Sequence, residues 1–217
     1  MKIDTNTINV LKNFAKVNPS IVFPEGNVLK TMSPSKTIMA KSEVTTHFEK
    51  RFAIYNLDRF LSTLSLFNDP ELTFKDKFVE ISDVNSKIRY TYAEETTITK
   101  APDKEIILPS IDVTFTLSNE NLKSVEKGAG ILQLPEIIVV GDGSTISLQA
   151  ADSKNPTSDV FSIEIGSTDK VFKAIFKSEN IKIIPGEYTV SISARGISHF
   201  VGKEAEYWIA VEQSSTF

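Results

Sequence analysis

The chain has 217 residues, of which 41% are hydrophobic, and carries a formal net charge of −4. This length suits one large domain or two domains of about 100 residues each. The absence of cysteine excludes a disulfide scaffold and thiolate-bound zinc or iron–sulfur sites. No apolar run approaches the ~20 residues of a membrane span, and the N-terminus lacks a signal-peptide pattern, so we expect a soluble intracellular protein.

The first half is expected to fold in the order helix, strands, helix, strands. Asp4 or Thr5 can cap a helix whose apolar residues recur at helical spacing up to Val17, before Pro19. A second helical face runs from Leu57 to Phe67. The strands expected in this half are 20–29, 37–44, 51–55, 72–74, 78–82 and 87–93.

The second half is expected to begin again after an irregular segment. Residues 94–109 are rich in threonine and proline and predict an extended linker. A helix then follows the cap residue Ser118, and Gly128 and Gly130 are expected to end it. The remaining elements expected here are strands 112–117, 136–140, 145–150, 160–165, 171–176, 187–194 and 206–212, with a short helix from Ser178 to Ile183 or Ile184.

The two halves also share short sequence strings. Leu11–Lys16 returns as Leu122–Lys127, and Ala53–Tyr55 returns as Ala174–Phe176. Duplicated halves of this size are typical of symmetric assemblies rather than of enzymes with one cleft. The pattern predicts an α+β architecture with antiparallel sheets, in which residues 1–108 form one domain, with a linker from about 94, and residues 109–217 the other.

Lysines recur on the polar sides of the expected helices. Lys12 and Lys16 lie opposite Leu11 and Phe14, and a second pair holds the same relation to Leu122 and Val125. The residues of this candidate basic surface are Lys12, Lys16, Arg59, Lys123, Lys127, Lys177 and Lys182. One such helix alone is usually just a solvated face. If the helices share one side of the molecule, their charges form a strip that attracts a phosphate backbone without reading bases.

Catalytic and metal-binding chemistry has little support in the sequence. His47 is expected in a polar turn and His199 in a loop, and neither has a partner at metal-ligand spacing. Gly141–Gly143 lacks the strand–loop–helix context of a phosphate-binding loop and is interpreted as a turn. We therefore expect no catalytic residue, no metal and no cofactor.

Two apolar patches stand out from their polar surroundings. They are Ile106–Leu108 in the linker and Tyr207–Ile209 near the C-terminus. Core packing is the simpler explanation, and more so for Tyr207 and Ile209. The alternative is a groove for a partner's short peptide, because exposed apolar patches mark interaction sites.

Several strings together resemble the DNA polymerase sliding clamps, most closely those of T-even-type bacteriophages. They cover nearly the whole chain in the right order. The strings are Leu11–Ala15, Ala53–Leu57, Leu64–Asp69, Pro185–Tyr188 and Tyr207–Glu212. The resemblance implies two similarly folded domains per subunit in a ring of three identical subunits, with helices lining the hole and sheets outside.

The resemblance also implies partners and a place of action. Duplex DNA passes through the hole against the basic residues named above, and the DNA polymerase binds by a C-terminal peptide. A separate ATP-driven clamp loader opens the ring, in the cytoplasm of an infected bacterial cell. Ile107, Leu108 and Trp208 are our candidates for the wall of the peptide pocket.

Two other functions remain open from the sequence. A non-enzymatic virion or surface module built from two β-rich domains would have similar strand content. It predicts no shared basic face on the helices. A hydrolase with an unrecognised site would need a cleft with perturbed titratable groups, for which His47 and His199 are the natural candidates.

Overall fold

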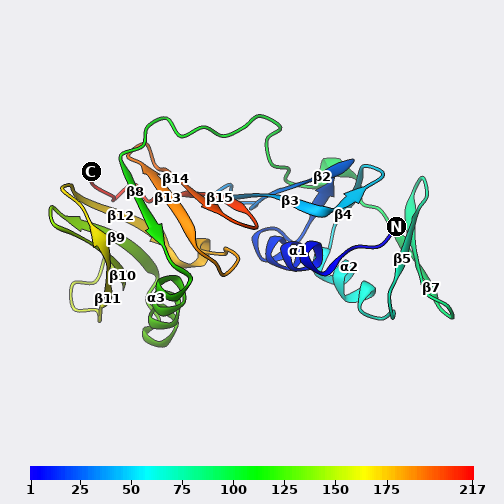
Figure 1. The fold of residues 1–217 in the computed structure, drawn as a ribbon, viewed down its shortest axis with the longest axis horizontal. Coiled ribbons are helices and arrows are strands. Elements are labelled where there is room, and N and C mark those ends of the chain that lie inside the picture. Colours follow the sequence, from blue (N-terminus) through cyan, green and yellow to red (C-terminus); the bar gives the residue numbers. More distant parts are fainter. The chain divides into compact units, whose positions relative to one another are not determined.

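The computed structural model describes all residues, 1–217, and its internal contacts divide the chain into two units (Figure 1). Unit 1 is Met1–Asp103 and unit 2 is Lys104–Phe217. Both units combine helices with antiparallel sheets, which makes the fold α+β as expected. None of the helices is both long and apolar enough to cross a membrane.

Unit 1 contains two α-helices, seven strands and one 3₁₀ turn. The helices are α1 (Thr5–Val17) and α2 (Leu57–Leu64), and the 3₁₀ turn η1 spans Glu95–Thr97. The strands are β1 (Ile21–Phe23), β2 (Gly26–Met32), β3 (Ile38–Phe48), β4 (Phe52–Ile54), β5 (Glu71–Phe74), β6 (Phe78–Ser82) and β7 (Lys87–Thr91). β1 pairs with β4, β2 pairs with β3, and β5, β6 and β7 form a three-stranded sheet in that order.

Unit 2 contains one α-helix, eight strands and one 3₁₀ turn. The helix is α3 (Asn119–Leu132) and the turn is η2 (Ser178–Asn180). The strands are β8 (Val113–Leu117), β9 (Glu136–Asp142), β10 (Thr145–Ala151), β11 (Phe161–Ser167), β12 (Val171–Lys177), β13 (Tyr188–Ser193), β14 (Ile197–Gly202) and β15 (Glu206–Ala210). One sheet has the order β11-β10-β9-β12, and β8, β13, β14 and β15 pair in that order.

The two units repeat one order of elements. After β8, unit 2 runs helix, four strands, helical turn and three strands, as unit 1 does from α1 to β7. The N-terminal residue of unit 1 takes the place of β8. The Met1 ammonium donates to the Leu72 carbonyl of β5 at 2.8 Å, and Leu72 N–H donates back to the Met1 carbonyl at 2.7 Å. The structure thus confirms two similarly built halves.

Each unit has a core between its helices and its strands. In unit 1, α1 packs on β3 and α2, and the Phe23 ring stacks on Phe52 with centroids 4.4 Å apart. In unit 2, α3 packs on β10 and β11, and Leu122 and Val125 are buried. These cores leave the opposite face of each helix in water.

Three of the expected elements were wrong. The single strand 20–29 is two strands, because Pro24 has no N–H to donate to a ladder and Gly26 turns with φ of +106°. The expected loop around His199 is strand β14, and the expected turn around His47 lies within β3. Small and polar residues around His47 and His199 gave no strand signal in the sequence. Both strands form because of their pairing with neighbouring strands in the sheets.

The expected ends of three helices were also wrong, and the helical face expected from Leu57 to Phe67 ends with α2 at Leu64. α3 continues through Gly128 and Gly130 to Leu132 and ends at Gln133, whose φ is +53°. Gly128 is there for close packing, because a Cβ at this position would lie 2.7 Å from the Phe161 ring. The helix expected from Ser178 to Ile184 is only the single turn η2.

Candidate nucleic-acid interface

Helix α1 presents two lysines opposite a fully buried face. Val10, Leu11 and Phe14 have no exposed surface, whereas Lys12 and Lys16 are exposed. The helix contains no acidic residue, and Lys16 lies in its last turn. A lysine there is stabilised by the helix dipole. α1 therefore carries a net positive face that no acidic residue of the helix offsets.

The N-terminus of α1 is fixed to β3 by a carboxylate cap. Asp4 Oδ1 accepts from Thr7 N–H at 2.9 Å, and Asp4 Oδ2 accepts from the hydroxyls of Thr7 and Thr46. Desolvation raises the pKa of Asp4, but the hydrogen bonds from Thr46 and Thr7 outweigh it and hold the pKa well below its ordinary value. The cap keeps the lysine-bearing helix in register with its sheet.

Helix α3 has a lysine pair in the same relation to its buried face. Leu122 and Val125 are buried, and Lys123 and Lys127 are exposed. Two glutamates, Glu120 and Glu126, are exposed on the same helix. The lysine charges of α3 are thus balanced within the helix, unlike those of α1.

Arg59 lies on the exposed side of α2, at a groove that the helix forms with β7. Asn56 caps the helix by accepting from Arg59 N–H at 2.8 Å. The groove has a volume of about 440 Å³, and its lining residues are Tyr55, Asn56, Arg59, Thr63 and 88–93. Burial raises the pKa of Tyr90, and the Arg59 charge opposes this rise. Arg89 also lines the groove, which the sequence did not indicate because nothing in the residues of a short strand marks a groove.

Lys177 and Lys182 are not on a helix. Lys177 is the exposed last residue of β12, and Lys182 is half-buried beyond η2. The expectation that four helices carry the basic residues was therefore wrong for this segment. Only α1, α2 and α3 present cations from an α-helix.

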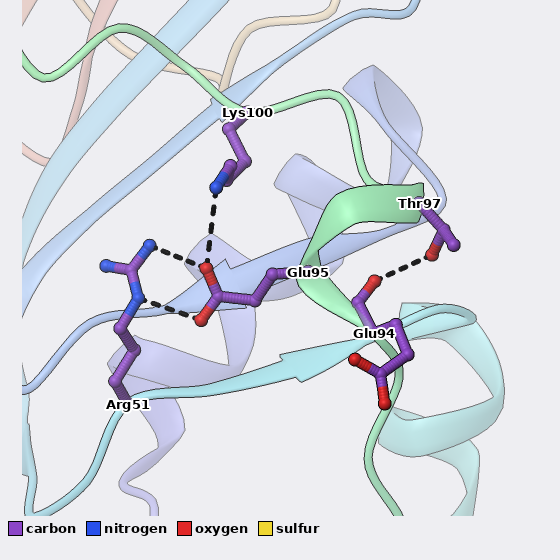
Figure 2. Close-up of polar contacts among 5 residues, drawn as sticks. All are labelled: Arg51, Glu94, Glu95, Thr97 and Lys100. Carbon is purple, nitrogen blue, oxygen red and sulfur yellow. Dashed lines mark hydrogen bonds and ion pairs between the residues drawn. The ribbon is translucent and has the colours of Figure 1, made fainter.

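The linker is anchored to unit 1 at its start by an ion-pair cluster (Figure 2). Arg51 donates to Glu95 through two nitrogens, at 2.8 and 2.9 Å, and Lys100 Nζ lies 3.5 Å from the same carboxylate. The hydrogen bond from Arg51 is the main cause that lowers the pKa of Glu95. Further along, Lys30 Nζ donates to the Asp103 carbonyl at 3.1 Å.

A cleft of about 310 Å³ lies between this part of the linker and strands β1 and β2. Ile21, Val22 and Val28 give it apolar walls, and Lys30 and Lys100 stand at it as cations. The sequence did not indicate this cleft, because its walls come from three segments far apart in the chain.

The three residues proposed for the peptide pocket have different environments. Ile107 is 83% exposed and Leu108 half-buried, whereas Trp208 is buried. The Trp208 indole Nε1–H donates to the Ile106 carbonyl at 3.1 Å and so holds the linker against β15. His199 stacks on the Trp208 ring with centroids 4.4 Å apart, and its Nε2 lies 3.0 Å from Glu206. His199 supports Trp208, a role that the expected loop position did not indicate.

Comparison with known proteins agrees with this architecture. Residues 3–100 match the family of DNA polymerase processivity factors, and residues 114–213 match the C-terminal domain of the gp45 sliding clamp. The chain is 37% identical to the sliding clamp of Vibrio phage KVP40, over 98% of this chain and 99% of that one. It is 30% identical to the sliding clamp of Enterobacteria phage T4, over 100% and 99% of the two chains.

Solved structures share the fold at low sequence identity. The structure described as the C-terminal region of FEN-1 bound to A. fulgidus PCNA matches with a TM-score of 0.68 at 15% identity, and 96% of each chain is covered. The Proliferating Cellular Nuclear Antigen of Entamoeba histolytica has a TM-score of 0.67 at 15% identity, with 94% of each chain covered. The chain belongs to the phage-type sliding clamps, which are non-enzymatic DNA polymerase processivity factors.

Proposed function

We propose that three copies of this chain form a closed ring around duplex DNA and tether the replicative polymerase to it. The observation that carries the proposal is the face of α1, where Lys12 and Lys16 are exposed and no acidic residue offsets them. Loose lysine contacts to phosphates hold DNA without reading sequence and so permit sliding. A polymerase tethered to such a ring stays at high local concentration and rebinds after release.

All seven residues proposed to face DNA remain in the proposal, but they lie on different kinds of element. Lys12, Lys16 and Arg59 come from helices of unit 1, and Lys123 and Lys127 come from α3. Lys177 contributes from the end of strand β12, and Lys182 from the loop after η2. The domain boundary at 108 also stays a prediction, within the irregular segment after η1.

Open edge strands support closure of the ring. In the sheet of unit 1, Met1 covers the edge strand β5, and β7 forms the other edge (Figure 1). In the four-stranded sheet of unit 2, Thr216 pairs with Lys173 and covers β12, while β11 forms the other edge. A sheet edge without a partner is a template for a strand of another copy.

The two open edges are complementary in charge and in apolar pattern. β7 exposes Lys87 and Arg89, and β11 exposes Glu164. Half-buried apolar residues alternate with these charges on both strands. The antiparallel register we propose keeps apolar beside apolar and puts Arg89 opposite Glu164 and Tyr90 opposite Ile163. Because the two edges differ, the contact is head-to-tail, and such contacts generate rings when the rotation closes.

The linker is the proposed contact for the polymerase peptide. Ile107 is exposed and can offer an apolar side chain to a partner. The hydrogen bond from the Trp208 indole to the Ile106 carbonyl holds the linker beside it in place. Ile107→Asp should weaken polymerase stimulation, and Ile111→Asp, at another exposed apolar position of the same segment, is the matched control. Equal behaviour of the two variants would remove Ile107 from the site.

Relatives in bacteriophages support action in the cytoplasm of an infected bacterial cell, together with a DNA polymerase and an ATP-dependent clamp loader. The experiment that tests the ring is the native mass of the purified chain across a concentration series. We expect a discrete trimer. A monomer at every concentration would contradict the proposal and leave the virion or surface module as the alternative.

A further inference from the structure

Two residues near the linker, His199 and Glu206, take no part in the function derived above. His199 of β14 lies directly opposite Trp208 of β15 in the antiparallel ladder, and its ring stacks on the indole. Glu206, two residues before Trp208 on the same face of β15, lies 3.0 Å from His199 Nε2. The Trp208 indole in turn donates to the Ile106 carbonyl of the linker. A continuous chain of contacts therefore runs from Glu206 to the linker.

We infer that His199 is a positioning residue for the polymerase peptide. It holds the Trp208 ring in the orientation in which the indole N–H fixes the linker, and Glu206 holds His199 in place for this. The inference rests on the proposed contact of the polymerase with Ile107, because it concerns how the linker presents that side chain. His199 acts through Trp208 rather than by contact with the peptide.

The first argument is the geometry of the stacked rings. The centroids of the His199 and Trp208 rings are 4.4 Å apart, and the ring planes differ by 11°. A tryptophan side chain has two rotatable bonds, and a flat stack against a fixed neighbour restricts the tilt of the indole plane. The indole N–H lies in that plane. Because the stack sets the plane, it also sets the direction in which the Trp208 Nε1–H points.

The second argument is that His199 is itself anchored. An ionised carboxylate only accepts hydrogen bonds, so His199 must carry a proton on Nε2 to bond Glu206 at 3.0 Å. This bond lies at the edge of the imidazole and stops rotation of the ring about its Cβ–Cγ bond. Glu206 and Trp208 both come from β15, whose pairing with β14 fixes their spacing from His199. The three side chains therefore form a preorganised unit on one face of this sheet.

The third argument is that the linker lacks regular structure at this point. Residues 104–109 form neither helix nor strand, so no ladder of hydrogen bonds holds them. The Ile106 carbonyl lies in the same planar peptide unit as the nitrogen and Cα of Ile107. The Trp208 N–H bonds this carbonyl at 3.1 Å and so fixes the plane from which Ile107 projects. On the other side, Pro109 restricts Leu108 to an extended conformation. The exposed Ile107 is therefore presented in one orientation as long as Trp208 is held.

Trp208 is the single tryptophan of the chain, so its fluorescence reports this contact directly. His199→Ala should shift the Trp208 emission to longer wavelength and speed tryptic cleavage after the exposed Lys104. It should also raise the protein concentration needed for half-maximal stimulation of the polymerase about fivefold, as expected when one hydrogen bond is lost. His47→Ala is the matched control, since it removes the other histidine, which is exposed on β3, and should change none of the three.

Two further variants separate the roles of the ring stack and of the N–H donor. Trp208→Phe keeps an aromatic ring against His199 but lacks the donor, and should reduce stimulation as His199→Ala does. His199→Phe keeps a ring against Trp208 and should recover most of the stimulation that His199→Ala loses. Circular dichroism checks that each variant keeps the fold.

Ile107→Asp, measured beside these variants, separates the inference from the proposed contact. If Ile107→Asp weakens stimulation but His199→Ala and Trp208→Phe do not, the positioning role is wrong and the linker contact stands. A loss of stimulation in His199→Ala without a change in Trp208 emission would also contradict the positioning role. If Ile107→Asp has no effect, the linker contact fails and the inference fails with it.

Discussion

Unit 1 and unit 2 follow the same order of elements, yet the segment after the fourth strand differs. In unit 1 it is the helix α2, with Asn56 as cap and Leu57, Phe60, Leu61 and Leu64 on one face. In unit 2 it is the single turn η2, followed by three β-branched isoleucines before Pro185. β-branched residues and a following proline both disfavour helix. A repeated order of elements therefore does not guarantee a repeated basic helix.

The units differ in charge as well. The lysines of α1 stand without acidic neighbours on the helix, while those of α3 alternate with glutamates. The open edge of unit 1 is basic and that of unit 2 carries a glutamate. Two unlike edges suit a head-to-tail ring, and the imbalance between helices predicts that unit 1 holds DNA more strongly than unit 2.

Charge reversal on the open edge strands β7 and β11 should have the largest effect, which is on trimer formation. Arg89→Glu puts two carboxylates opposite each other at the proposed contact and should weaken trimer formation about a hundredfold, since like charges there cost several kcal/mol. Glu164→Arg should do the same, and the double variant should recover the trimer in sedimentation. Lys77→Glu is the control, because it reverses an exposed charge of unit 1 outside strand β7 and should leave the trimer unchanged. A double variant no better than either single one would disprove the register.

Removal of the lysines of α1 or α3 should have the next largest effect, which is on retention on DNA. Lys12→Ala with Lys16→Ala should reduce retention on DNA more than Lys123→Ala with Lys127→Ala, with the fold intact by circular dichroism. Each lost phosphate contact should lower the slope of log affinity against log salt by about 0.9. Equal effects of the two pairs would show that the glutamates of α3 do not offset its lysines.

Two glycines of α3, which α1 lacks, allow a matched pair of variants. Gly130→Ala adds a Cβ with nothing within 4 Å and should raise the free energy of unfolding by about 0.5 to 1 kcal/mol. Gly128→Ala pushes a Cβ against the Phe161 ring and should lower it by about 1 to 2 kcal/mol. Urea denaturation measures both, and equal signs would contradict the packing of α3 on β11.

The cap of α1 should show an effect smaller than that of Gly128→Ala. Asp4→Ala should lower the free energy of unfolding by about 1 kcal/mol at pH 7. Because the pKa of Asp4 is lower in the folded than in the unfolded chain, its stabilisation is present above the unfolded value, about 3.9, and fades as the pH falls through the folded value. Asp4→Asn should therefore flatten the loss of stability below pH 5, and an unchanged pH profile would count against the cap.

The sequence predicted the helices α1 and α2, most strands and the doubled order, because apolar spacing is set locally. It predicted exposure correctly for Lys12 and Lys16 for the same reason. It could not place β14, because His199 lies in a strand only through its pairing with the neighbouring strands β13 and β15. It could not place the end of α3 either, because Gly128 continues the helix in order to pack closely against the Phe161 ring. The α2–β7 groove and the cleft beside Arg51 join distant segments, which spacing along the chain does not reveal.

The central claim is that the closed ring holds DNA by topology. The most direct measurement compares retention of the loaded protein on closed circular DNA and on the same DNA after one double-strand cut, at rising salt. We predict stable retention on the circle and rapid loss once the ends are free. Equal retention on both forms would contradict encirclement.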